Sequence, residues 1–370
     1  MVERFHGIDR HRRSATVSVL NREGVEEKFF SLTHDFNRYV EMLGAEDVVV
    51  METGAGSFFW ADKIEARGAR CFIIDPYRFR IIKDSWNKTD KRDSRNMSKA
   101  LWVYMVTGEF GLPIVYKPSA LIRELRKLYA QHQILNKQIR MLKNNIQTVL
   151  ADNGIVLPAL QKNHLLSVKR GKDVLEELDI SEASRISIAM NLGILWHVVE
   201  KKEEIVKEIL RIGEPLKEEV DLLISIRGIT PLTAMAFLAD VGDIRRFKTL
   251  RKMNAYLGLV PKMKESGSRS RSGHINKASR KLTRTILTQS LIQITDASLY
   301  FRDYYDELKS RRGSGRARIA VIRKLCGIMR RMLLDGKAYK HVEIPLYEKK
   351  RKCYEKQLNQ IKEKMERQSA

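Results

Sequence analysis

The stretch FHGIDRHRRSATVSVLNREGVEEKFFSL, residues 5–32, decides the fold of the N-terminal part of the chain. Its runs Phe5–Asp9, Ala15–Leu20 and Glu27–Leu32 carry the clustered or alternating apolar residues that are typical of strands. The turn NREG between the second and third runs contains Gly24, a residue that suits a tight turn. We therefore expect the three runs to be antiparallel neighbours in one sheet.

A different pattern follows these three runs. Thr33–Leu43 predicts a helix, and Val48–Met51 is a continuous apolar run typical of a strand buried on both faces. Ser57–Arg67 predicts the next helix and Cys71–Ile74 the next strand. Three strands, helix, strand, helix, strand is the element order of the ribonuclease-H-like fold, whose mixed sheet carries carboxylates at strand ends. Other mixed sheets start with the same order and are the alternative. The sequence therefore predicts an N-terminal α/β domain of this type.

The middle of the chain is expected to be helical. Apolar residues recur at alternating spacings of four and three, and His132 takes the one polar position among Leu121, Leu125, Leu128, Leu135, Ile139, Leu142, Ile146 and Val149. Four heptads of this kind predict a coiled-coil seam in which His132 sets the register. A second helical stretch, Leu192–Ile212, can fold back on the first as an antiparallel hairpin or pair with another subunit.

The chain changes again after Pro215. The segment LISIRGITPLTAMAFLADVGDIRRFKTL, residues 223–250, predicts two short helices around Gly228. This is the pattern of a helix-hairpin-helix unit, whose turn N–H groups suit a DNA phosphate, although an ordinary helical hairpin is the alternative.

The remaining C-terminal part is expected to be mainly helical. Helices are predicted over most of Lys281–Asp335, with the segment at 310–318 a phosphate-contacting or solvated interruption. The tail from Glu348 is so charged that we expect a solvated helix or disorder.

Composition narrows the class of partner. The 370 residues hold 69 Lys and Arg against 45 Asp and Glu, a net charge of +24, which indicates a polyanionic partner and most often nucleic acid. This composition is also compatible with a ribosomal protein or a protein that binds a membrane surface. Cys71, Cys326 and Cys353 lie too far apart for a disulfide framework or a zinc motif. No signal-peptide core or membrane-spanning apolar run is present, so we expect a cytoplasmic, nucleoid-associated protein without a membrane partner.

Four acids form the first candidate site. Asp9 ends the first strand, Glu52 ends the buried strand, and Asp90 and Asp93 are spaced to share one helix face. Acids at the ends of adjacent strands can converge with a helical acid, and carboxylate oxygens suit Mg²⁺ or Mn²⁺. Such ions stabilise the attacking and leaving oxygens in phosphoryl transfer. A solvated turn residue is the alternative for each acid alone.

A serine in a basic segment forms the second candidate site. Ser266 precedes Gly267, which lets a phosphate approach the backbone closely. The cations expected to neutralise developing charge are Lys264, Arg269, Arg271, Lys277 and Arg284. A solvated serine in a flexible basic linker is the alternative.

Three separated blocks together resemble one family. They are GIDRHRRSA at 7–15, METGAGSFFW at 51–60 with NKTDKRDSR at 87–95, and YLGLVPKMKESGSRSRSGHINKASRKLTR at 256–284. The chain resembles, to about residue 340, the DEDD insertion-sequence transposases of the insertion-sequence one-hundred-and-ten family, which includes the Piv-type DNA invertases. Ser279 stands where the family usually has glycine.

This resemblance implies a role for each candidate residue. Asp9, Glu52, Asp90 and Asp93 match the family's metal-binding acids in a RuvC-like domain, and Ser266 matches its nucleophilic serine, with Ser268 in reserve. The family also implies donor and target DNA, a guide (bridge) RNA in its RNA-guided members, and a homo-oligomer, a dimer or tetramer, with sites built from two protomers.

The predicted organisation has four parts. They are a RuvC-like DEDD domain at 1–112, a coiled-coil helical hairpin at 113–215, a mainly α C-terminal domain with helix-hairpin-helix and serine loop at 216–345, and a charged tail at 346–370. The predicted activity is site-specific DNA recombination through a covalent phosphoserine–DNA intermediate. A metal-dependent structure-specific nuclease and a non-enzymatic nucleic-acid-binding scaffold are the alternatives.

Overall fold

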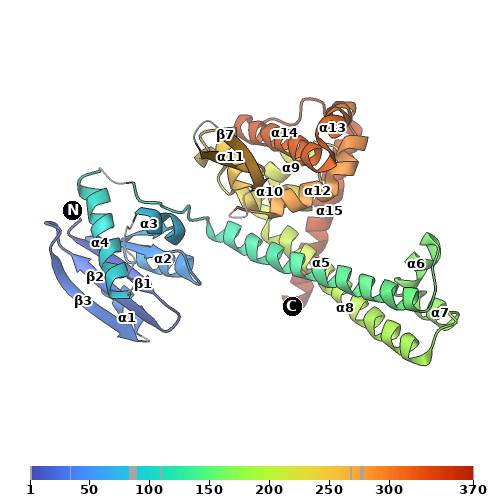
Figure 1. Cartoon of the computed structure of the whole chain (residues 1–370), viewed down its shortest axis with the longest axis horizontal. Coiled ribbons are helices and arrows are strands. Elements are labelled where there is room, and N and C mark those ends of the chain that lie inside the picture. The colour runs from blue at the N-terminus through green and yellow to red at the C-terminus, as the bar shows by residue number, and fades with distance from the viewer. Residues whose placement is uncertain are drawn as a thin grey trace. The chain divides into compact units, whose positions relative to one another are not determined.

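The computed structural model describes residues 2–33, 35–82, 90–108, 111–266, 269–275 and 279–369, without the side chains of 80–82, 90–91, 262–266, 269–275 and 368–369. The chain divides into two compact units, Met1–Lys117 and Pro118–Ala370. In Figure 1 the sheet and short helices of the first unit are blue to cyan, and the largely helical second unit runs from green to red. The predicted boundaries at 215 and 345 inside the second unit stay predictions.

The first unit is built on one mixed sheet with the strand order β3-β2-β1-β4-β5. The strands are β1 (Arg4–Arg10), β2 (Ser14–Leu20), β3 (Glu26–Thr33), β4 (Asp47–Glu52) and β5 (Arg70–Ile74). β1 pairs antiparallel with β2 and parallel with β4, while β2 pairs antiparallel with β3 and β4 pairs parallel with β5. All five predicted strands are confirmed, in the ribonuclease-H-like order.

Helices cover both faces of this sheet. On one face, Phe79 of α3 (Pro76–Ile82) and Met97 and Leu101 of α4 (Asp90–Val106) are buried against Phe5 and Val50. On the other face, α1 (Phe36–Glu41) and α2 (Ser57–Glu65) are buried against a second set of strand side chains. Burial from both sides explains the unbroken apolar run of β4. The helix predicted at Thr33–Leu43 is shorter, because β3 extends through Thr33.

Two long helices, α5 (Ala120–Asp152) and α8 (Glu182–Ile212), pack along each other within one chain. Figure 1 shows them side by side, with the unpredicted α6 (Ala159–Leu165) and α7 (Gly171–Glu176) at one end. α8 begins well before Leu192 because Ser181 caps it, accepting a hydrogen bond from the Ser184 N–H. Buried side chains of the seam include Leu135, Leu142, Ile146, Leu192 and Leu195. The fold-back prediction is confirmed, and coiled-coil packing stays a prediction.

The rest of the second unit surrounds one large core. Its elements are 3₁₀ turns at Glu214–Leu216 and Ile244–Arg246, α9 (Lys217–Ile224), α10 (Pro231–Val241), α11 (Leu250–Tyr256), β6 (Pro261–Ser266), β7 (Arg269–Ile275), α12 (Leu282–Asp296), α13 (Leu299–Arg312), α14 (Ser314–Asp335) and α15 (Ile344–Ser369).

Three C-terminal expectations change in the structure. The flexible linker that was the alternative for the basic segment after Leu259 is not found in its described part, since β6 and β7 pair antiparallel. The interruption expected at 310–318 is reduced to Gly313, whose φ of 79° ends α13. The charged tail is helical but not simply solvated, because Tyr354 and Leu358 of α15 are buried in the large core. No helix in the described part of the chain combines the length and apolar character needed to cross a bilayer.

Candidate functional site

Two of the predicted acids end adjacent parallel strands. The register pairs Ile8 with Met51, so Asp9 and Glu52 are the next residues on β1 and β4. Both lie on the sheet face that α4 covers, because Phe5 and Val50 on the same alternation are buried with residues of α4. Asp9 is mostly buried, with 14 % of its side chain exposed. The sheet therefore presents two carboxylates at one edge, on one face.

Close contact between α4 and β1 brings the other two acids to that face. A Cβ atom added to Gly7 would lie 2.1 Å from the Ser94 carbonyl oxygen and 2.3 Å from the Ser98 nitrogen. Only glycine permits this approach. A Cβ on Gly24, in the turn after β2, would lie 2.8 Å from Trp102 of α4, and Leu20 at the end of β2 pairs with Phe5. The last turns of α4 therefore lie toward the Phe5 end of β1, and its first turn lies toward the Asp9 end.

That first turn carries the remaining two predicted acids. Asp93 is half-buried next to Ser94, and Asp90 is the first residue of α4, with its side chain outside the described set. Within the described residues, no three His, Cys, Asp or Glu side chains are grouped closely enough to hold a metal ion. The donors fit a hard divalent cation in their chemistry, since all four are carboxylates.

Sequence reasoning missed two basic neighbours of these acids. The His11 Nε2 lies 3.6 Å from the Asp9 Oδ2. The Arg10 guanidinium donates to the Ala55 carbonyl oxygen, which ties the end of β1 to the loop after β4. Burial lowers the pKa of Arg10 from its usual value. The signal was present in the sequence as the basic run IDRHRR directly after the strand.

The predicted serine ends β6 in the second unit. The register pairs Ser266 with Arg269 and Lys264 with Arg271, so these four positions share one face of the two-stranded hairpin. Gly267, Ser268 and Lys277 lie outside the described residues. The backbone thus places the serine position at the tip of a hairpin, beside three basic positions.

The base of this hairpin is tied to the helical core. Arg284 donates to the Gly258 carbonyl oxygen at 2.9 Å, and the Arg280 N–H donates to the Tyr256 carbonyl oxygen at 2.9 Å. Arg284 is therefore a structural tie at the foot of the loop. A Cβ on Gly258, whose φ is +67°, would lie 2.3 Å from the Ser279 Oγ.

Asp240 is a further residue that sequence reasoning missed. It is completely buried. Its Oδ2 accepts from the Thr283 N–H at 2.7 Å and the Thr283 hydroxyl at 2.9 Å, and its Oδ1 accepts from Arg280 at 3.1 Å. Asp240 therefore fixes the start of α12, where the chain leaves the serine hairpin.

Gly228 lies in the turn at residues 225–230, between α9 and α10. Its φ is +85°, and an added Cβ would lie 2.8 Å from Ile294 of α12. Thr230 caps α10 by accepting from the Thr233 N–H at 3.1 Å. Within the described part of the chain, the N–H groups of Gly228 and Thr230 donate no hydrogen bond.

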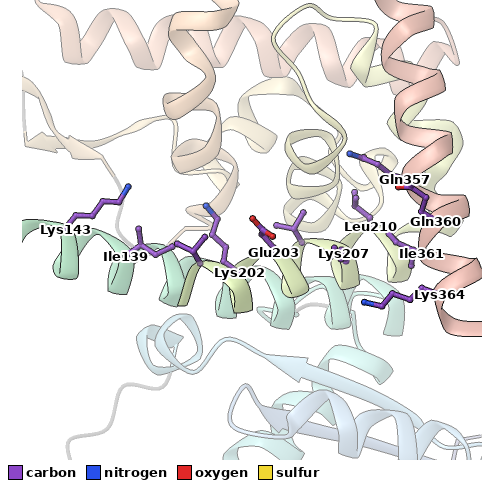
Figure 2. A pocket seen from close by; sticks show the side chains of 12 residues that line it. Ile139, Lys143, Lys202, Glu203, Lys207, Leu210, Gln357, Gln360, Ile361 and Lys364 are labelled. Carbon is purple, nitrogen blue, oxygen red and sulfur yellow. The ribbon is translucent and has the colours of Figure 1, made fainter. Parts of the chain in front are cut away.

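A groove of about 620 Å³ lies between α5, α8 and α15. Figure 2 shows lysines from all three helices around it, with Leu210 and Ile361 among the apolar side chains. The four lysines are Lys143, Lys202, Lys207 and Lys364. None of them forms an ion pair with another described residue. We call this surface the basic groove.

Comparisons with known proteins agree with this architecture. Residues 6–153 match a family model of DEDD transposases described as "Transposase", and residues 220–306 match the family described as "Transposase IS116/IS110/IS902 family". A probable family 20 transposase of Pseudomonas aeruginosa is 24 % identical over 299 residues, which cover 77 % of this chain and 79 % of that protein. The transposase for insertion sequence element IS1111A of Coxiella burnetii is 25 % identical over 301 residues, 79 % of each chain.

These matches show that the chain, whose N-terminal sheet is of the RuvC-like type, is a DEDD transposase, an enzyme that cuts and rejoins DNA. The chain belongs to the IS116/IS110/IS902 family of insertion-sequence transposases.

Proposed function

We propose that this transposase is a site-specific recombinase that uses the four acids and Ser266 together, with a guide RNA selecting donor and target DNA. The observation that carries the proposal is the placement of Asp9 and Glu52 on one face of one sheet edge, under the first turn of α4. We place the protein in the cytoplasm, at the nucleoid.

Asp9, Glu52, Asp90 and Asp93 are the residues that would hold Mg²⁺ or Mn²⁺. When bound, such an ion supplies Lewis-acid stabilisation of charge on the phosphate oxygens. The Ser266 Oγ loses its proton and attacks phosphorus, forming the Oγ–P bond. The P–O bond to the leaving strand breaks, and the leaving deoxyribose oxygen keeps the bonding electrons and takes up a proton. Rejoining reverses this step with a different strand end, so no nucleotide hydrolysis is needed.

In this proposal, different residues contact the reacting phosphate and the rest of the bound nucleic acid. Lys264, Arg269, Arg271 and Lys277 neutralise charge at the reacting phosphate. Gly228 and Thr230 offer N–H groups to a phosphate of the bound nucleic acid, and the basic groove adds sequence-independent attraction. Asp240, Arg280 and Thr283 hold the foot of the serine hairpin. The functional unit is a homo-oligomer, either a dimer or a tetramer.

The test is covalent capture on a denaturing gel. Purified protein is incubated with element-end DNA, the flanking RNA and Mg²⁺, and we expect a protein–DNA adduct. Ser266→Ala should lose both adduct and cleavage, because the attacking atom is gone, while Ser272→Ala in β7 keeps both. Asp9→Ala should lose cleavage by about a hundredfold or more and still bind DNA.

Three outcomes would contradict parts of the proposal. Cleavage by Ser266→Ala without an adduct in either protein identifies a nuclease that uses water. An adduct that persists in Ser266→Ala moves the nucleophile, with Ser268 next. Unchanged activity without RNA removes the guide from the proposal.

A further inference from the structure

One lysine of the C-terminal helix α15 donates hydrogen bonds to the backbone of the turn at residues 225–230 and of the preceding helix end. The Lys350 Nζ donates to the carbonyl oxygens of Ile224 at 2.8 Å, Ile226 at 2.9 Å and Ile229 at 3.0 Å. These carbonyls belong to the end of α9 and to the turn itself. An ammonium group has three donors and no acceptor, so Lys350 meets three converging oxygens with three N–H bonds.

Two further contacts join residues 339–350 to the turn. The Tyr339 N–H donates to the Ser225 Oγ at 2.8 Å, and Arg227 pairs with Glu343 at 2.9 Å. Residues 339–350 lie beyond residue 306, where the C-terminal family match ends. This support is therefore contributed by residues outside the two matched segments.

We infer that the carbonyl oxygens of Ile224, Ile226 and Ile229 form a cation site, that Lys350 is its built-in occupant, and that Lys350 is thereby a positioning residue for the turn. The chemistry is that of a carbonyl cradle, in which backbone oxygens replace the hydration shell of a monovalent cation. The Ile226 carbonyl would keep the hydrogen bond that it accepts from the Ile229 N–H at 3.1 Å. The Ile224 and Ile229 carbonyls would lose the donor that Lys350 supplies, which disfavours this turn conformation.

The consequence for DNA rests on the proposed function of the turn. The peptide unit that presents the Ile229 carbonyl to Lys350 also carries the Thr230 N–H group, which points the opposite way because the peptide is trans. The Gly228 N–H group belongs to the same turn, between the Ile226 and Ile229 carbonyls along the chain. Burial, followed by the neighbouring Arg227, lowers the pKa of Lys350 to about 8, and Glu343 opposes this. The ammonium form therefore predominates at pH 7, and the cradle is occupied when the turn binds phosphate.

The test replaces the built-in cation with a dissolved one. Lys350→Ala removes the ammonium and its stem, leaving room for K⁺ or methylammonium but not for N-methylglucamine. Duplex DNA affinity is measured at pH 7 and constant ionic strength in each chloride salt. We expect Lys350→Ala to bind about tenfold more weakly in N-methylglucamine and to recover to within about twofold in K⁺ or methylammonium.

The control is Lys349→Ala, which removes the same charge from an exposed neighbour. This variant and the wild type should bind equally in all three salts. The inference would be overturned if no cation changed either the DNA affinity or the hydrogen exchange of the turn in Lys350→Ala, or if Lys349→Ala showed the same cation dependence.

Amide hydrogen exchange of Ile226–Thr230 without DNA separates the cation site from the proposed function. In Lys350→Ala, K⁺ should slow this exchange. If K⁺ slows the exchange but leaves the DNA affinity unchanged, the cation site stands and phosphate binding by the turn is refuted. If Lys350→Ala does not fold, Lys350→Met retains the stem, and its turn should exchange faster in every salt. Wild-type exchange in Lys350→Met would overturn the inference.

Discussion

Asp47 shows how one residue ties the first strand to the sheet. It is fully buried and accepts from Arg4 at 2.6 Å, from the His6 Nε2 at 3.0 Å and from the Gly44 N–H at 2.8 Å. Tyr39 donates to the His6 Nδ1 at 2.6 Å, which leaves the other ring nitrogen to donate to Asp47. The result is a continuous polar chain on the face of β1 that is opposite Asp9.

Acid stability should depend on this carboxylate. Burial alone would raise the pKa of Asp47, but hydrogen bonds from His6, Arg4 and Gly44 outweigh it and hold the pKa well below 3.8. The stabilisation is therefore present above pH 4 and is lost as pH falls below that value. We expect Asp47→Asn to cost about 2–4 kcal/mol at pH 7 and to unfold with a weaker pH dependence below pH 4. Urea titrations at several pH values check this, and a parallel pH dependence in both proteins would contradict it.

At the scale of elements, the docking of α4 on β1 governs the acid site. Gly7→Ala would place a Cβ 2.1 Å from the Ser94 carbonyl oxygen, so α4 must move away from the sheet. Because Asp90 and Asp93 move with it, we expect cleavage to fall by about tenfold or more while DNA binding changes little. The measurement is the single-turnover cleavage rate beside DNA affinity.

The control for this substitution is another glycine. Gly54→Ala adds the same methyl group where no atom lies within 4 Å. Equal cleavage by Gly7→Ala and Gly54→Ala would show that the position of α4 does not matter for the chemistry.

The seam between α5 and α8 makes a second prediction at this scale. Leu135 is buried among α8 side chains, so Leu135→Asp places an unpaired charge in an apolar seam. We expect a loss of about 3 kcal/mol or more in stability, or a smaller oligomer. Gln138→Asp on the exposed face should change neither. Thermal melting and light scattering measure the two effects, and an unchanged melting temperature and mass for Leu135→Asp would count against the seam.

Local sequence patterns predicted the helices and strands of this molecule better than the long-range contacts that join them. Strand alternation gave β1, β2 and β3, and the heptad spacing gave α5, because each signal lies within one element. Asp240 and Lys350 carried no such signal, since their partners lie 43 and over 120 residues away. The same reason applies to α15, whose charge predicted a solvated tail while Tyr354 and Leu358 found apolar partners in the core.

At the scale of the whole molecule, we expect particular lysines to account for part of the DNA attraction that the net charge of +24 provides. We expect the double variant Lys202→Gln, Lys207→Gln in the basic groove to lower the salt dependence of DNA binding. Each lost phosphate contact reduces the slope of log K against log salt by about 0.9.

The matched control removes two charges from the same helix outside the groove. Lys201 and Arg211 pair with Glu204 at 3.0 Å and Glu208 at 2.8 Å, so Lys201→Gln, Arg211→Gln should leave the slope nearly unchanged. Equal slopes for the two double variants would exclude the groove from nucleic-acid contact.

The large core of the second unit draws Tyr129 of α5, Phe237 of α10 and Tyr354 of α15 into one cluster. A ribosome adding about 5–20 residues per second takes roughly 10–50 s to pass from the first of these to the last. During that interval the apolar faces of α9 and α10 lack their final cover, whereas the N-terminal unit is already complete. Newly made chains should thus need shielding by chaperones until α15 emerges, and nascent chains stalled before Tyr354 should be the most easily captured.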